Sequence, residues 1–136
     1  MSSSNKVEIT INAPVSTVFN YTTDPVNTPR WILSVVLEER SDKDVQVGTQ
    51  YRQLIREGSR VIPGSGYVVT AYEQNKVFEL RAVGGEYKCR YEYADLSGGK
   101  TLLVYTESTG TDNSLESPLN LDDFSGLKQI IEAELQ

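Results

Sequence analysis

The stretch DDFSGLKQIIEAEL, residues Asp122–Leu135, decides how the chain folds. Apolar side chains recur in it at the three- and four-residue spacing of a helix. They are Phe124, Leu127, Ile131 and Leu135, with Ile130 beside them. Most other positions are polar, so the spacing predicts a helix with one apolar face. Asn120 followed by Asp123 is typical of a helix start, where side-chain oxygens accept hydrogen bonds from free backbone amides.

Upstream of this helix, residues 7–108 read mostly as strand. Val7, Ile9 and Ile11 alternate with polar residues, which indicates a half-buried strand. Residues 14–22 show helical spacing, and a second helix begins at Asp24-Pro25 and is kept short by Pro29. Six further strands are predicted over residues 33–40, 48–56, 61–72 (with a bulge or an open edge at 63–66), 77–82, 87–93 and 101–108. A polar loop, residues 109–119, leads to the last helix.

These elements predict an α+β fold. Consecutive strands joined by short turns pair antiparallel. We therefore expect one sheet that curves around the C-terminal helix, with two short helices after the first strand. A length of 136 residues suits a single domain, residues 1–136. The space between sheet and helix is then either a packed core or a pocket.

Composition narrows the possible partners. The formal charge of −6, with lysines and arginines scattered singly, argues against a nucleic-acid partner or an anionic membrane surface. A single cysteine, Cys89, forms no intrachain disulfide, and the first residues show no signal peptide or membrane span. We therefore expect a cytoplasmic protein.

The chain contains no histidine. A nucleophile activated by histidine is excluded, and the commonest transition-metal ligand is missing. We expect neither a metal site nor a cofactor. Any catalysis would have to use carboxylates, tyrosines or arginines.

Several short motifs, in this order and spacing, resemble the START-like (SRPBCC) superfamily of helix-grip proteins, which includes polyketide cyclase/dehydrase-type members. The motifs are Val7-x-Ile9-x-Ile11-x-Ala13-Pro14, Val18-Phe19-x-Tyr21-x-x-Asp24, Trp31, Val47-Gly48-Thr49, Gly99-x-Thr101 and the closing helix. The resemblance implies a cavity between the sheet and the final helix. Many members bind lipids, sterols or polyketides there, and the superfamily has no shared catalytic signature. Gly126 inside the last helix and the interruption at residues 63–66 depart from the family pattern.

Tyrosine is the unusual residue of the chain, with eight copies against three phenylalanines. Strand alternation points Tyr51, Tyr91, Tyr93 and Tyr105 toward the helix, together with Gln53 and Phe78, and places Trp31 near an entrance. These residues are the predicted ligand-binding set. Their rings could line a cavity, with hydroxyls that orient a polar group of the ligand. They could equally fill the core, because tyrosine is also a favoured strand residue.

Glu107 is the candidate catalytic residue. It shares the strand phase of Leu103 and Tyr105, which places it on the concave side of the sheet, where a carboxylate could act as an acid or base. The alternative, which we favour at this point, is that the strand twists outward by Glu107 and exposes it to water. Arg81 and Arg90 lie in clear polar phases and are expected on the outer face, where a pair with Glu79 or Glu92 would be ordinary.

Three functions follow from these alternatives. The first is binding of a small hydrophobic or amphipathic molecule of lipid, polyketide or aromatic type. The second is an enzyme of the cyclase, dehydratase or isomerase type that uses tyrosine and Glu107. The third is a protein-interaction module with a filled core.

Overall fold

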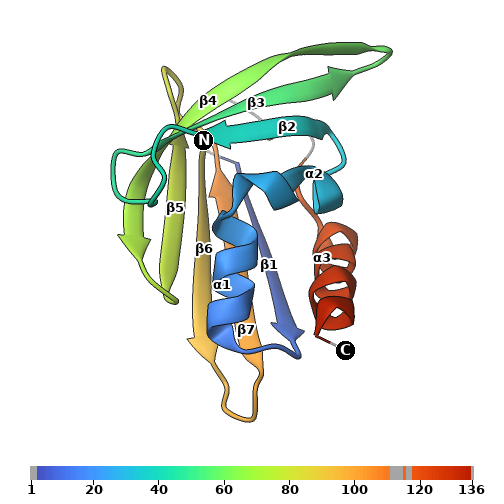
Figure 1. Cartoon of the computed structure of the whole chain (residues 1–136). Helices are drawn as coiled ribbons and strands as arrows, with labels where there is room; N and C mark the ends of the chain where they lie inside the picture. The colour runs from blue at the N-terminus through green and yellow to red at the C-terminus, as the bar shows by residue number, and fades with distance from the viewer. Residues whose placement is uncertain (1–2, 111–114, 116–117, 136) are drawn as a thin grey trace.

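The computed structural model describes residues 3–110, 115 and 118–135, in which seven strands form one antiparallel sheet with helices on one side (Figure 1). The elements are β1 (Ser4–Ile11), α1 (Val15–Thr23), the short 3-10 helix η1 (Pro25–Asn27), α2 (Thr28–Trp31), β2 (Val35–Arg40), β3 (Gln50–Glu57), β4 (Arg60–Glu73), β5 (Val77–Ala82), β6 (Lys88–Asp95), β7 (Thr101–Ser108) and α3 (Leu121–Glu134). Much of the predicted loop at 109–119, namely residues 111–114 and 116–117, lies outside the described residues.

The sheet has the strand order β1-β7-β6-β5-β4-β3-β2. The predicted meander from β2 to β7 is confirmed, and β1 completes the sheet by pairing with β7, where Val7 faces Tyr105. Figure 1 shows β2 and β3 crossing above the helices, while β5, β6, β7 and β1 run steeply behind them. The predicted α+β helix-grip architecture is therefore confirmed.

Helix α3 packs its apolar face against the concave side of the sheet. Phe124, Leu127 and Ile131 are fully buried, and the Phe124 ring lies 4.9 Å from that of Tyr105 on β7. The predicted start is also confirmed, because the Asn120 side chain accepts from the backbone of Asp123 and the Asp123 side chain accepts from that of Asn120. Leu135, predicted on the apolar face, is exposed instead, because the helix ends at Glu134 and Leu135 follows it as the capping residue.

The segment after α1 differs slightly from the prediction. The 3-10 helix ends at Asn27, and α2 starts at Thr28 with Pro29 in its first turn. Proline is tolerated there because the first amides of a helix have no partner within the helix. Pro29 therefore helps to start α2 and does not end the preceding helix.

Strand β4 runs through the predicted interruption at residues 63–66. Arg52 pairs with Gly66 and Leu54 pairs with Pro63, so β4 holds one extra residue there. Of the two alternatives predicted from the sequence, a bulge or an open edge, the structure has the bulge. A Cβ atom on Gly64 would lie 2.9 Å from Cγ2 of Ile55, which explains why a residue without a side chain occupies this position.

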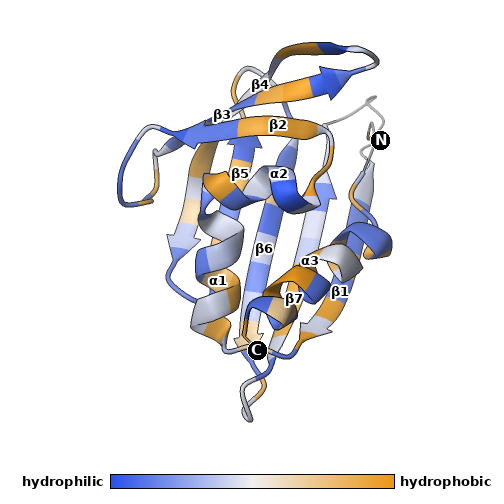
Figure 2. Cartoon of the chain, turned by 45° about the vertical axis from the view of Figure 1, so that its right-hand side comes forward, coloured by the Kyte–Doolittle hydropathy of each residue, from blue (hydrophilic) through white to orange (hydrophobic). Residues whose placement is uncertain are grey.

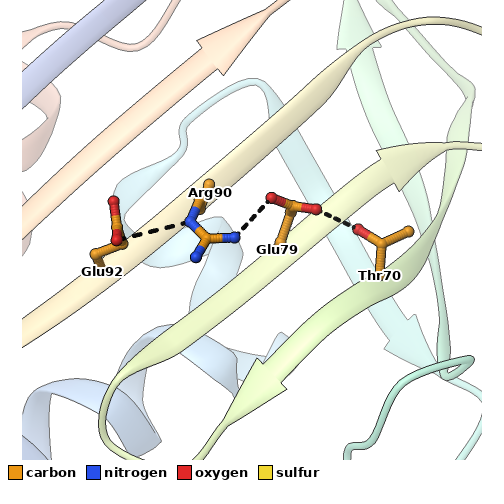
Figure 3. Close-up of polar contacts among 4 residues, drawn as sticks. All are labelled: Thr70, Glu79, Arg90 and Glu92. Atoms are coloured by element: carbon orange, nitrogen blue, oxygen red, sulfur yellow. Dashed lines mark hydrogen bonds and ion pairs between the residues drawn. The ribbon is translucent and has the colours of Figure 1, made fainter.

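The outer face of the sheet carries an ion-pair network across β4, β5 and β6 (Figure 3). Nη1 of Arg90 lies 2.9 Å from Oε2 of Glu79, and Nε of Arg90 lies 3.7 Å from Glu92. Thr70 donates to the other oxygen of Glu79 at 2.8 Å. The expected outward direction of Arg90 is thus confirmed. In the described part of the chain, no helix has both the length and the apolar composition needed to cross a membrane.

Candidate functional site

A cavity of about 580 Å³ lies between the concave face of the sheet and the segments around α2 and α3. Aromatic rings form much of its wall: Trp31, Tyr51, Tyr67, Phe78, Tyr87, Tyr91 and Tyr105. Polar lining groups include Glu38, Gln53 and Glu107. Ligand sites in proteins commonly enclose about 300–1,000 Å³, so the volume suits a small molecule.

The aromatic wall is built from rings of four strands, β3, β5, β6 and β7. The rings of Tyr51 and Phe78 lie 5.6 Å apart, those of Phe78 and Tyr91 5.8 Å, and those of Tyr91 and Tyr105 4.9 Å. Such edge-to-face and tilted contacts fix the rings against one another. The wall is therefore preformed before any ligand enters.

Glu107 faces the cavity and is 4% exposed, so the outward, solvated position that we favoured from the sequence is wrong. Strand β7 keeps its alternation to its end because it is paired on both sides, with β1 and β6. Tyr87 donates to Oε1 of Glu107 at 3.1 Å. The side chain of Asn5 and the backbone amide of Leu119 donate to Oε2 at 3.1 and 3.0 Å. Glu107 therefore ties β1 and the segment before α3 to the sheet.

Glu38 is a second buried carboxylate in the lining. It belongs to β2, a strand that Figure 2 shows above α2 with one hydrophobic and one hydrophilic part. Thr28 donates to Oε1 and Gln53 to Oε2, both at 2.6 Å. Burial raises the pKa of Glu38, and the two hydrogen bonds, which favour the charged form, offset only part of that effect.

Sequence analysis missed Glu38 because of a bulge in β2. Regular alternation from Val35 would place Leu37 inward and Glu38 outward. The pairing with β3 shifts between Val35 and Leu37, so the residues after the shift point to the opposite faces of the sheet from those that regular alternation predicts. Leu37 is 44% exposed and Glu38 only 8%. A bulge without glycine or proline leaves no clear signal in a single sequence.

The hydroxyl and thiol groups of the wall are protonated at neutral pH. Burial raises the pKa of Tyr51 and of Tyr67 to about 12. Burial, and after it the charge of Glu107, raises the pKa of the Cys89 thiol to about 12 as well. Cys89 is therefore an unreactive thiol, and the tyrosines are available as hydrogen-bond donors.

A second hollow, of about 570 Å³, lies outside the sheet edge, between residues 24–29 and 36–43. None of its lining residues is aromatic, and six of them are charged: Asp24, Glu38, Glu39, Arg40, Asp42 and Lys43. The ring-lined cavity is thus the better candidate for an apolar ligand.

The family described as polyketide cyclase/dehydrase and lipid transport matches residues 4–136. The chain belongs to this family. No curated protein sequence matches the chain at a significant level.

Solved structures share the fold of this polyketide cyclase/dehydrase family member at low sequence identity. The crystal structure of Ara h 8.0201 is 16% identical, with a TM-score of 0.69 over 98% of this chain and 99% of the other. A Deinococcus radiodurans protein is 14% identical, with a TM-score of 0.71 over 97% and 96%. The Zhui aromatase/cyclase from Streptomyces sp. R1128 is 14% identical, with a TM-score of 0.64 over 99% and 87%.

Most of the predicted ligand-binding residues of this family member lie together in the cavity wall. They are Tyr51, Gln53, Phe78, Tyr91 and Tyr105. Trp31 also lines the cavity, but it is 5% exposed and packs 5.1 Å from the Phe124 ring, so it is not at an entrance. Tyr93 lies outside the lining, because its ring packs on Phe19 at 5.0 Å and its hydroxyl lies 2.6 Å from that of Thr22.

The arrangement offers hydrogen bonds to a bound molecule and does not resemble a metal centre. Among the described residues, no three cysteine, aspartate or glutamate side chains lie close enough together to hold a metal ion. The polar groups of the cavity's inner lining include the carboxylates of Glu38 and Glu107, the amide of Gln53 and several tyrosine hydroxyls, while Arg56 and Glu57 line it from exposed positions.

Proposed function

We propose that the protein binds a small hydrophobic or amphipathic molecule in the ring-lined cavity. The observation that carries this proposal is the cavity itself, about 580 Å³ in volume and walled by aromatic side chains. Apolar surface leaves water when a ligand fills such a wall, at roughly 25 cal/mol per Å². Membership of the polyketide cyclase/dehydrase and lipid transport family supports the same function.

A neutral fluorophore, N-phenylnaphthylamine, tests this proposal. Its emission should rise saturably with one site per chain. Ala82→Trp places a large ring in the lining and should weaken binding at least about tenfold, or 1.4 kcal/mol. Ala94→Trp, at an exposed position of β6 outside the lining, is the matched control and should bind as the wild type does.

Two results would overturn the proposal. One is an emission rise that never saturates, and the other is equal weakening by both tryptophan variants. Native mass spectrometry of the protein purified from cells adds an independent readout, since a retained small molecule would appear as a discrete mass increase.

A second candidate, acid–base catalysis of the cyclase, dehydratase or isomerase type, rests on Glu38. A carboxylate with a raised pKa is suited to proton transfer nearer neutral pH. Glu107 is less suited, because it accepts three hydrogen bonds from the protein, whereas Glu38 accepts two. If this function holds, cyclisation of a linear poly-β-ketone thioester should be faster with the wild type than with Glu38→Gln. Equal rates would exclude Glu38 as the catalytic group.

A further inference from the structure

The buried charge that faces the cavity is negative and has no cationic partner. Glu38 and Glu107 are both buried, and neither forms an ion pair with any described residue. The other charged lining residues, Arg56 and Glu57, are exposed and of opposite sign. A buried carboxylate gains most from a partner that is itself charged and donates hydrogen bonds.

Of the two carboxylates, Glu38 is the one with room for a ligand. Glu107 accepts three hydrogen bonds and joins parts of the fold. Glu38 accepts one on each oxygen, although a carboxylate can accept about four in all. At least one lone pair on each oxygen therefore remains for a donor in the cavity.

Tyr91 supplies an independent sign of an absent polar partner. The residue is 6% exposed, lines the cavity, and its hydroxyl has no hydrogen-bond partner among the described residues. A buried hydroxyl without a partner is costly, by about 1–3 kcal/mol, and a ligand could supply the missing hydrogen bond.

The surrounding rings favour the same kind of group. The rings of Phe78 and Tyr105 flank that of Tyr91 at 5.8 and 4.9 Å. Aromatic faces attract cations within about 6 Å, whereas a ligand carboxylate would meet the negative charges of Glu38 and Glu107. Anionic amphiphiles such as fatty acids are therefore poorly suited to this cavity.

Building on the binding function proposed above, we propose that the ligand is an amphipathic amine. Its apolar, preferably aromatic, body fills the ring-lined wall, and its protonated amino group donates to the carboxylate of Glu38. Tyr91 lies in the same lining and offers its hydroxyl to a polar atom of the ligand.

Three probes with the same ring and different head groups test the proposal: naphthylethylamine (cationic), naphthylethanol (neutral) and naphthylacetate (anionic). Each is measured at neutral pH and low salt by displacement of N-phenylnaphthylamine. The amine should bind at least about tenfold more tightly than the alcohol, and naphthylacetate should bind most weakly.

Two variants assign the preference to its residues. Glu38→Gln should lower the amine's affinity to that of the alcohol and change the alcohol's affinity less than about threefold. Glu39→Gln removes the same charge from the exposed face of the same strand and should keep the order of the three probes. Tyr91→Phe removes only a hydroxyl and should weaken the amine more than it weakens naphthylacetate. If Glu38→Gln does not fold, Tyr91→Phe is the variant that assigns the amine preference to this cavity.

The outcomes separate this proposal from the binding function on which it rests. If the alcohol binds and the amine binds no better, the amine proposal is overturned and the binding function stands. If Glu38→Gln, correctly folded, retains the amine preference, the role of Glu38 is overturned. If no probe displaces the fluorophore and the fluorophore itself does not bind, the binding function fails.

Discussion

At the residue scale, the two buried carboxylates have different surroundings and therefore different roles. Glu107 is held by three donors, Asn5 on β1, Tyr87 just before β6 and Leu119 before α3, and it acts as a junction. Glu38, which also lines the cavity, is held by two donors and keeps free lone pairs. The same side chain is thus structural at one end of the site and available at the other.

The junction at Glu107 predicts a contrast between two substitutions. Glu107→Gln retains an oxygen for Asn5 and Leu119, and its amide can donate to Tyr87, whose hydroxyl can also accept. Glu107→Leu leaves the Leu119 amide without a partner and should cost about 1–3 kcal/mol of unfolding free energy. Urea denaturation measures both. Equal stability of the two variants would contradict the assigned role.

The direction of a side chain could be predicted where its strand alternates regularly, and it could not be predicted near a bulge or a strand end. Tyr51, Phe78, Tyr91 and Tyr105 face the cavity because their strands keep a period of two. Glu38 was missed because the bulge in β2 reverses the phase. The position of Glu107 depended on how far β7 remains paired at its end, which a single sequence does not specify.

At the element scale, α3 was predictable because three independent signals agree in it. The apolar spacing, the start signal at Asn120 and the acidic first turn all indicate the same helix. The divided helix between residues 25 and 31 was harder to predict, because Pro29 can end one helix or begin another.

Gly126 in α3 provides a prediction of increased stability. A Cβ atom on Gly126 would meet nothing within 4 Å, and the residue lies inside the helix. Gly126→Ala should therefore raise the free energy of unfolding by about 0.5–1 kcal/mol. Gly64→Ala is the matched contrast and should lower it, because its Cβ atom would lie 2.9 Å from Cγ2 of Ile55. The expectation fails if Gly126→Ala melts at or below the wild-type temperature.

At the scale of the whole molecule, two carboxylates give opposite dependences of stability on pH. Burial alone would raise the pKa of Glu79, but hydrogen bonds from Thr70 and Arg90 outweigh it and lower the pKa. The contribution of Glu79 is therefore lost as the pH falls through its folded-state pKa. The stability contribution of Glu38 has the opposite dependence on pH, because burial raises the pKa of Glu38 above its value in the unfolded chain.

Glu38 should make the fold less stable as the pH rises. The folded state keeps the Glu38 proton above the unfolded pKa of about 4.3, so stability falls between that value and the folded-state pKa. Glu38→Gln should remove this decline in unfolding free energies measured over a pH series. Glu39→Gln, on the exposed face, should retain it. A wild-type decline that persists unchanged in Glu38→Gln would show that another group causes it.

The pairing of the first strand with the last also sets an order of assembly. Val7 faces Tyr105 and Ser4 faces Ser108, whereas β3, β4, β5 and β6 each pair with a strand close by in sequence. Contacts between distant segments cost more loop entropy and tend to form slowly. In pulse-labelled hydrogen exchange during refolding, we expect amides of β1 to become protected after those of β4 and β5, and simultaneous protection would contradict this order. Glu107, Asn5 and Leu119 meet only at that last step, so a partly folded chain has no enclosed cavity and cannot retain a ligand.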